Sequence, residues 1–196
     1  MLSRGLPWDV DIRPQGKPKT PLSCAKPGRG FGFAEFMDEG DALSRDTLDD
    51  LSTDPRVRLI YSPQHVSELI FPFCVYEAKS AIGGTLLFAE NQAAVGAATA
   101  ATLFSELAKL SDAAASSIPP VIMLASSGPL WSIHVCFAKT VKGRDEYHIY
   151  PLTSIFQLSD PVDLFEFQIA LSRIRDYALD EIKPWLNKQV ASLVPR

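Results

Sequence analysis

The stretch that decides the fold is Phe71–Ser80, which reads FPFCVYEAKS. Aromatic and β-branched residues and a cysteine dominate its first six positions, a composition typical of a buried strand. Because side chains alternate between the two faces of a strand, Glu77 and Lys79 point the same way and Ala78 points the other way. An acid and an amine are costly to bury unless they pair or bind a ligand. The sequence therefore predicts a candidate site at the end of this strand.

The bulk composition predicts one compact core. The chain has 196 residues, of which 46% are hydrophobic, and a formal net charge of −4. This length and composition suit a single domain, and the net charge argues against a strongly basic nucleic-acid platform. Residues 1–30 carry six basic and two acidic side chains, whereas residues 31–54 carry eight acidic and one basic. We expect a basic Pro/Gly-rich arm over residues 1–30, either a phosphate contact or a solvated flank, and one domain over residues 31–196.

Cysteine and histidine spacing predicts neither a disulfide framework nor a zinc site. Cys24, Cys74 and Cys136 show no paired spacing, and the three histidines lie far apart. No stretch reaches the roughly 18 apolar residues of a membrane span, and the N-terminus lacks the core of a signal peptide. We expect an intracellular protein of the cytoplasm or nucleus, with no membrane partner. Residues 1–4 have no helix of their own, which leaves open a truncated or minimal form of the chain.

Further strands and helices are predicted along the rest of the chain. Strands are expected over residues 30–36, 121–126, 130–138 and 146–152, a short surface helix near 43–51, and a long alanine-rich helix from about 87 to 111. A C-terminal helix begins at the N-cap Asp160 with Pro161 as its first residue, and Pro184 is expected to kink or end it. This alternation predicts an α/β fold with a central mixed sheet flanked by helices.

Three motifs occur in an order that resembles the fungal PD-(D/E)XK nuclease-like family. They are Phe71–Ser80, the segment Glu90–Ala94 at a helix start, and the turn Gly128–Trp131. The resemblance runs from about Lys26 to the C-terminal helix, and it implies a restriction-endonuclease-like core. The Glu-x-Lys triplet alone is common, and its place on an apolar strand before the other two motifs makes the likeness more specific.

The resemblance also implies a chemistry. Members of that superfamily hold a divalent metal, commonly Mg²⁺, with an Asp and a Glu, and a Lys positions or activates the water that attacks a phosphodiester. It implies that Glu77 is a metal ligand, that the Ala78 carbonyl completes the metal shell, and that Lys79 orients the water. Gln92 resembles the glutamine that some members use beside the Lys. The implied cofactor is Mg²⁺ or Mn²⁺, and the implied partner is DNA or RNA.

The chain departs from the family pattern at one metal ligand. Relatives carry Pro-Asp on the preceding strand, and here Gly28 follows Pro27, so Gly28 occupies the position of the Asp and Arg29 adds a positive charge. A site with one carboxylate binds Mg²⁺ poorly, because this ion relies on few, well-placed anionic ligands. Glu35 lies about 23 Å away along an extended strand and is not in register to replace it. We therefore expect a degenerate metal site.

Each candidate residue has a structural alternative. Glu77 and Lys79 are alternatively a structural ion pair, Gln92 an ordinary first-turn helix residue, and Glu90 a first-turn acid that compensates the helix dipole. His134 and His148 are expected on strand faces without a catalytic role.

Three functions therefore stay open. The first is metal-dependent hydrolysis of DNA or RNA phosphodiesters. The second is a non-catalytic module that binds nucleic acid or protein. The third is group transfer on a nucleic-acid-linked substrate such as aminoacyl-tRNA, as in cyclodipeptide synthesis. The oligomeric state is not predicted.

Overall fold

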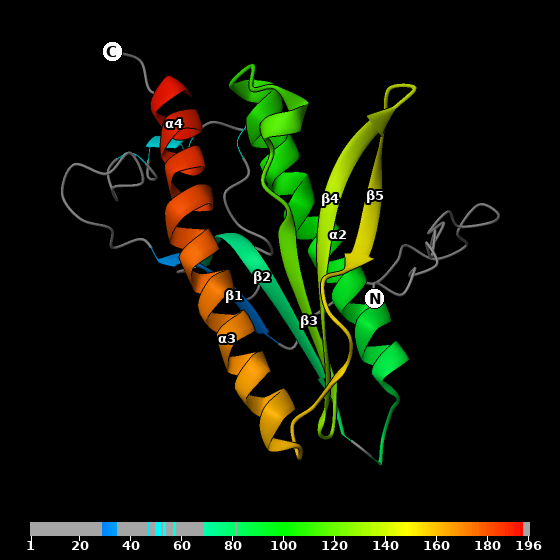
Figure 1. Cartoon of the computed structure of the whole chain (residues 1–196). Coiled ribbons are helices and arrows are strands. Elements are labelled where there is room, and N and C mark those ends of the chain that lie inside the picture. The colour runs from blue at the N-terminus through cyan, green and yellow to red at the C-terminus, as the bar shows by residue number, and fades with distance from the viewer. Residues whose placement is uncertain are drawn as a thin grey trace, which may run out of the picture.

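The computed structural model describes residues 29–34, 69–80 and 82–193, together with a few positions between residues 47 and 57. The strands are β1 (Arg29–Ala34), β2 (Leu69–Lys79), β3 (Val121–Ser127), β4 (Leu130–Val141), β5 (Arg144–Pro151) and β6 (Phe156–Gln157). The α-helices are α2 (Leu86–Leu110), α3 (Pro161–Tyr177) and α4 (Lys183–Leu193), and a short 3₁₀ helix covers Ala115–Ser117. Figure 1 shows the sheet between α2 on one side and α3 on the other.

The sheet is mixed. Its strand order is β1-β2-β3-β4-β5, and β6 pairs with the start of β4. β2 and β3 run parallel and are joined by the crossover helix α2, whereas β1–β2, β3–β4, β4–β5 and β4–β6 are antiparallel. The predicted α/β class, with a central mixed sheet flanked by helices, is confirmed.

Small residues let α2 lie close to one face of the sheet. The buried side of the helix includes Ala89, Ala93, Gly96, Ala97, Ala100 and Ala101. The alanines among them form one core cluster with Phe71, Val75 and Met123 of the strands beneath. Since alanine and glycine project little from the helix, the backbone of α2 can approach the sheet closely, and larger side chains such as Phe104 fill the space further along.

The opposite face of the sheet carries a smaller core. Cys74, Ile122, Leu124 and Ile133 pack there against Phe156 and Phe167. Phe167 is the one fully buried residue of α3, and this helix exposes many apolar side chains, among them Val162 and Phe165. The cover that α3 provides is therefore much looser than that of α2.

The start of the C-terminal helix is as predicted. The Asp160 side chain accepts hydrogen bonds from the backbone N–H groups of Val162 and Asp163, and Pro161 occupies the first turn. A π-helical segment, Ala178–Ile182, follows α3 and precedes Pro184. Proline cannot donate a backbone hydrogen bond, so a break in the regular helix is expected at this point. The chain nevertheless continues as α4 and packs on α2.

Most predicted strands and helices are present, with shifted bounds. β4 extends to Val141, since the two-residue turn Lys142-Gly143, with φ of 51° and 77°, carries the hairpin further than expected. The pairing of β1 with β2 shifts register between Phe31 and Phe33, at Gly32. Thr47, Asp50 and Leu51 are helical, and the other positions of the predicted helix near 43–51, like the arm before residue 29, lie outside the described residues.

The prediction that Glu90 and Gln92 lie in the first turn of the long helix is wrong. Thr85 caps this helix, and the first turn begins at Leu86 and contains no acidic residue. Glu90 and Gln92 thus belong to the second turn, where the helix dipole has little effect on an acid.

Within the described ranges, no helix combines the length and the apolar character that a membrane crossing requires.

Candidate functional site

Polar side chains gather on the α2-facing side of the sheet, where β2 ends. Strand register places them on one face: Glu77 lies beside Ala125 of β3, which in turn lies beside Ser132 of β4, so β3 separates the two groups of polar side chains. His134 follows two residues after Ser132 and so shares its face. We call the set Glu77, Lys79, Glu90, Ser132 and His134 the Glu77 cluster.

Glu77 and Lys79 form an ion pair. Lys79 Nζ donates to Glu77 Oε1 at 3.1 Å. Glu77 is 6% exposed, whereas 27% of the Lys79 side chain remains accessible. The stem of Lys79 passes close to Gly84, since a Cβ at Gly84 would lie 3.1 Å from Lys79 Cγ. The pair therefore sits at the border between the core and solvent, with the lysine toward solvent.

A second polar group joins α2 to β4. Ser132 Oγ donates to Glu90 Oε1 at 2.8 Å, and His134 Nε2 lies 3.9 Å from the same oxygen. Burial lowers the pKa of His134 below its ordinary value, against the opposing attraction of the Glu90 carboxylate. Because the Ser132 hydroxyl donates to the carboxylate and not to the imidazole, these residues do not form the nucleophile and base pair of a serine hydrolase.

The remaining predicted site residues are not part of this cluster. Gln92 is exposed on α2, and no contact of its side chain with Glu77 or Lys79 is present among the described residues. Ala78 is exposed and, by strand alternation, its side chain points to the α3 side. Gly28 lies outside the described residues.

The described residues around Glu77 do not fit a divalent cation. No group of three His, Cys, Asp or Glu side chains placed to hold a metal ion occurs in the described part of the chain. Glu77 supplies one carboxylate there, and its Oε1 already accepts a hydrogen bond from Lys79. Mg²⁺ requires near-octahedral oxygen ligation, and an ammonium group beside the carboxylate opposes it.

The two described cysteines are not nucleophiles. Cys74 and Cys136 are free and buried, and burial raises the pKa of each thiol to about 12. Both remain protonated at neutral pH, so they serve as small apolar core residues, as the sequence predicts.

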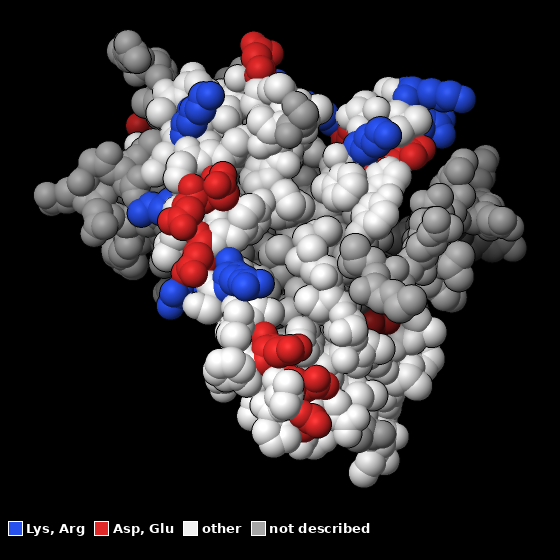
Figure 2. Space-filling view, in the orientation of Figure 1, with Lys and Arg blue, Asp and Glu red and all other residues white. Residues whose placement is uncertain are grey.

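Basic side chains collect at the other end of the sheet. The tip of the β4–β5 hairpin carries Lys139, Lys142 and Arg144, all exposed, beside Glu146 and the Lys109–Asp145 ion pair. Figure 2 shows these lysines and arginines at the hairpin tip and acidic side chains at the lower end of the molecule. Lys79 lies next to the start of β4, so the length of β4 separates it from this cationic tip.

Sequence reasoning identified Glu77 and Lys79 but missed Glu90, Ser132 and His134 as a group. The alternation of Ser132 and His134 indicates a shared face, which was a usable signal. Nothing in the sequence indicates that Glu90, more than 40 positions away, lies above them.

Comparisons with protein family models, with curated proteins and with solved structures found no match.

Proposed function

We propose that this chain is a PD-(D/E)XK nuclease-like protein that acts on phosphodiester bonds of DNA or RNA through Glu77 and Lys79, with a degenerate metal site. The observation that carries the proposal is the ion pair of a buried Glu77 with a partly exposed Lys79 at the end of β2. A buried carboxylate held by an ammonium group at the end of an inner strand is the part of a nuclease site that the sequence resemblance assigns to these positions.

Lys79 has the larger part in the proposed chemistry. Its ammonium group is accessible and can stabilise negative charge that develops on phosphoryl oxygens in the transition state. Glu77 holds this ammonium group in position through the 3.1 Å contact. Because the described ligands do not fit Mg²⁺, the proposal assigns no role to a metal held by this chain alone.

A second candidate function is binding of nucleic acid without cleavage. It is favoured by the exposed cations Lys139, Lys142 and Arg144 at the β4–β5 tip, far along β4 from Lys79. Phosphate backbones bind to clustered lysine and arginine largely irrespective of sequence. Contact at this tip would hold nucleic acid away from the Glu77 cluster.

One experiment separates the two candidates. The full chain is incubated with plasmid DNA and with total RNA, with Mg²⁺, with Mn²⁺ or with EDTA, and cleavage and gel retardation are both recorded. Variants are Lys79→Ala, Glu77→Gln, and the control Lys188→Ala, whose lysine is exposed on α4, away from both the Glu77 cluster and the hairpin tip. A double variant, Lys142→Gln with Arg144→Gln, tests the hairpin tip.

The nuclease proposal predicts cleavage that Lys79→Ala reduces at least about tenfold, equivalent to one lost charge-assisted interaction, while Lys188→Ala leaves it unchanged. Unchanged cleavage in the Lys79→Ala variant would show that Glu77 and Lys79 are not the site of cleavage. Retardation without cleavage, lost in the hairpin double variant, would replace the nuclease by the binding module. A product that requires Lys79 but no added metal, formed from a charged tRNA, would favour group transfer.

A further inference from the structure

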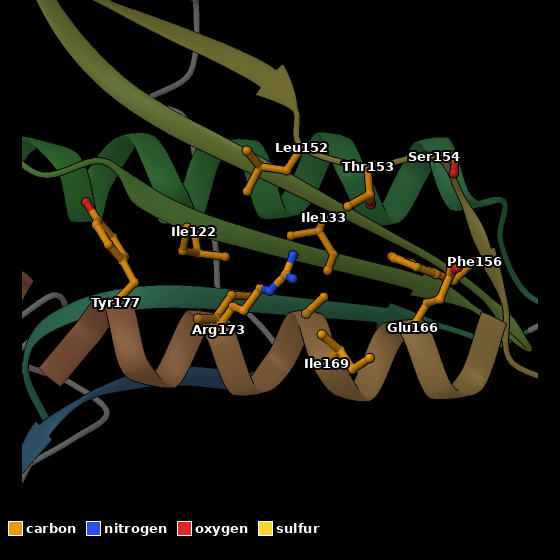
Figure 3. Close-up of a pocket in the computed structure, with 12 residues that line it drawn as sticks. Ile122, Ile133, Leu152, Thr153, Ser154, Phe156, Glu166, Ile169, Arg173 and Tyr177 are labelled. Atoms are coloured by element: carbon orange, nitrogen blue, oxygen red, sulfur yellow. The ribbon is translucent and has the colours of Figure 1, made fainter. Parts of the chain in front are cut away.

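A cavity of about 620 Å³ opens on the α3 side of the sheet, away from the Glu77 cluster (Figure 3). Ile122 and Ile133 of the sheet form its floor together with Phe156, and Ile169 and Ala170 of α3 form the facing wall. The volume lies within the range of about 300–1,000 Å³ that is usual for small-molecule sites. The lining is mainly apolar, so an occupant must be largely hydrophobic.

Arg173 projects from α3 into this apolar cavity. Figure 3 shows its guanidinium group reaching from the helix toward Ile133 and Leu152. Among the described residues Arg173 takes part in none of the ion pairs, unlike its neighbour Arg175, which pairs with Asp176 at 2.7 Å. Arg173 is an exposed residue, so its guanidinium group is accessible at the border of the apolar lining. An accessible guanidinium group without an anionic partner in the described structure is suited to bind a carboxylate in a bidentate manner.

Two other polar groups bear on the choice of ligand. Thr153 lines the cavity and adds a polar side chain to its lining, although its Oγ1 is itself buried and has no hydrogen-bond partner in the described structure. Glu166 is the acid of the lining and lies two helical turns from Arg173, about 10 Å along the axis, toward Ser154 and Phe156. The positive and negative charges are therefore separated, and an anion at Arg173 avoids Glu166.

We propose that this cavity binds a small amphipathic monocarboxylate, such as a medium-chain fatty acid, with its carboxylate at Arg173 and its apolar chain against the isoleucines. The proposal is independent of the nuclease-like function, because the cavity and the Glu77 cluster lie on opposite faces of the sheet. A ligand of this kind would also cover the apolar side chains between α3 and the sheet that the loose packing of α3 leaves open.

Calorimetry with three matched probes tests the proposal on the full chain. Octanoate, octanol and octylamine have the same apolar tail and differ in the charge of the head group. We expect octanoate to bind at least about tenfold more tightly than either other probe, as one charge-assisted contact implies. Arg173→Gln should remove this preference, and the control Arg175→Gln, on the same helix but outside the cavity, should keep it. Ala170→Phe should block all three probes by filling the cavity.

Several results would overturn the proposal. They are the absence of octanoate binding at millimolar concentration, octylamine binding as tight as octanoate binding, or unchanged octanoate affinity in Arg173→Gln. Circular dichroism on each variant separates lost binding from lost folding, and if Arg173→Gln unfolds, the probe preference of Arg173→Lys decides. Self-association that covers α3 and excludes octanoate would instead assign this face to a second copy of the chain.

Discussion

The candidate site depends on Lys79, because this partly exposed lysine forms an ion pair with the buried carboxylate of Glu77. Its Nζ lies 3.1 Å from Glu77 Oε1, and its stem lies against Gly84. Removal of a charged partner from a buried carboxylate costs much more than removal of an exposed ion pair, because the carboxylate keeps its desolvation cost. Lys79 and Lys109 therefore differ in their effect on stability although both form ion pairs.

Lys79→Met is expected to lower the free energy of unfolding by about 1–3 kcal/mol, because Glu77 loses a charged hydrogen-bond donor while remaining buried. Lys109→Met, at a pair whose lysine is 59% exposed, is expected to cost less than about 1 kcal/mol. Urea denaturation followed by circular dichroism measures both. Equal losses in the two variants would contradict a special role for the buried pair.

His134 is expected to make stability depend on pH. Burial lowers the pKa of His134 in the folded protein below 6.5, the ordinary value that it keeps in the unfolded chain. At a pH between the folded and the unfolded pKa, the unfolded chain therefore binds a proton that the folded chain does not. The stability that the neutral imidazole contributes is therefore complete above pH 6.5 and is lost as the pH falls through the folded pKa.

His134→Gln should thus lose less stability than the unmutated protein when the pH is lowered from 7.5 toward 5, as urea midpoints at each pH would show. Glu90→Gln should lose more, since the carboxylate of Glu90 raises the pKa of His134 and its removal leaves the burial effect unopposed. If the stability of all three proteins fell equally with pH, His134 would not be the source of the pH dependence.

At the scale of elements, α2 and α3 cover the sheet in different ways. The first half of the α2 face that meets the sheet is made of alanine and glycine, and Ala93, Ala97 and Ala100 are completely buried. α3 buries Phe167 and leaves a cavity beside it. Tight packing of α2 holds the parallel strands β2 and β3 in place, and with them the position of Glu77. Loose packing of α3 on the opposite face leaves room for a ligand.

Ala97→Leu should destabilise the protein by about 1–3 kcal/mol, because the larger side chain has no space between α2 and the sheet. Val95→Leu, at a 41% exposed position of the same helix, is the matched control and should change stability by less than about 0.5 kcal/mol. Urea midpoints at an unchanged slope measure the difference. A tolerated Ala97→Leu would mean that the helix and sheet approach less closely than described.

At the scale of the whole molecule, one mixed sheet separates three surfaces. The Glu77 cluster lies under the start of α2. The cavity lies under α3 (Figure 3), and the cationic tip lies at the far end of β4 and β5 (Figure 2). The three surfaces are formed by different elements, so each can be tested by its own variant. Lys79 belongs to the Glu77 cluster, Arg173 to the cavity and Lys142 to the cationic tip.

Local sequence patterns predicted the elements well, because their causes are local. The alternation in Phe71–Ser80 indicated a strand with Glu77 and Lys79 on one face, and the Asp160-Pro161 pair marked a helix start that the structure contains. The extra length of β4 was missed, because it depends on a hairpin turn at Lys142-Gly143 that lies beyond the apolar run. The resemblance to a nuclease-like family stays a prediction.

The sequence by itself determined which side chains share a strand face, where the helices begin and that the protein has an α/β core, since all of these follow from residue spacing and local backbone preferences. Only the tertiary structure decided that Glu90 meets Ser132 and His134, that Lys79 lies far from the hairpin cations, and that Arg173 enters an apolar cavity. These contacts join segments tens of residues apart, and their geometry follows from how α2 and α3 pack on the sheet, which no local pattern specifies.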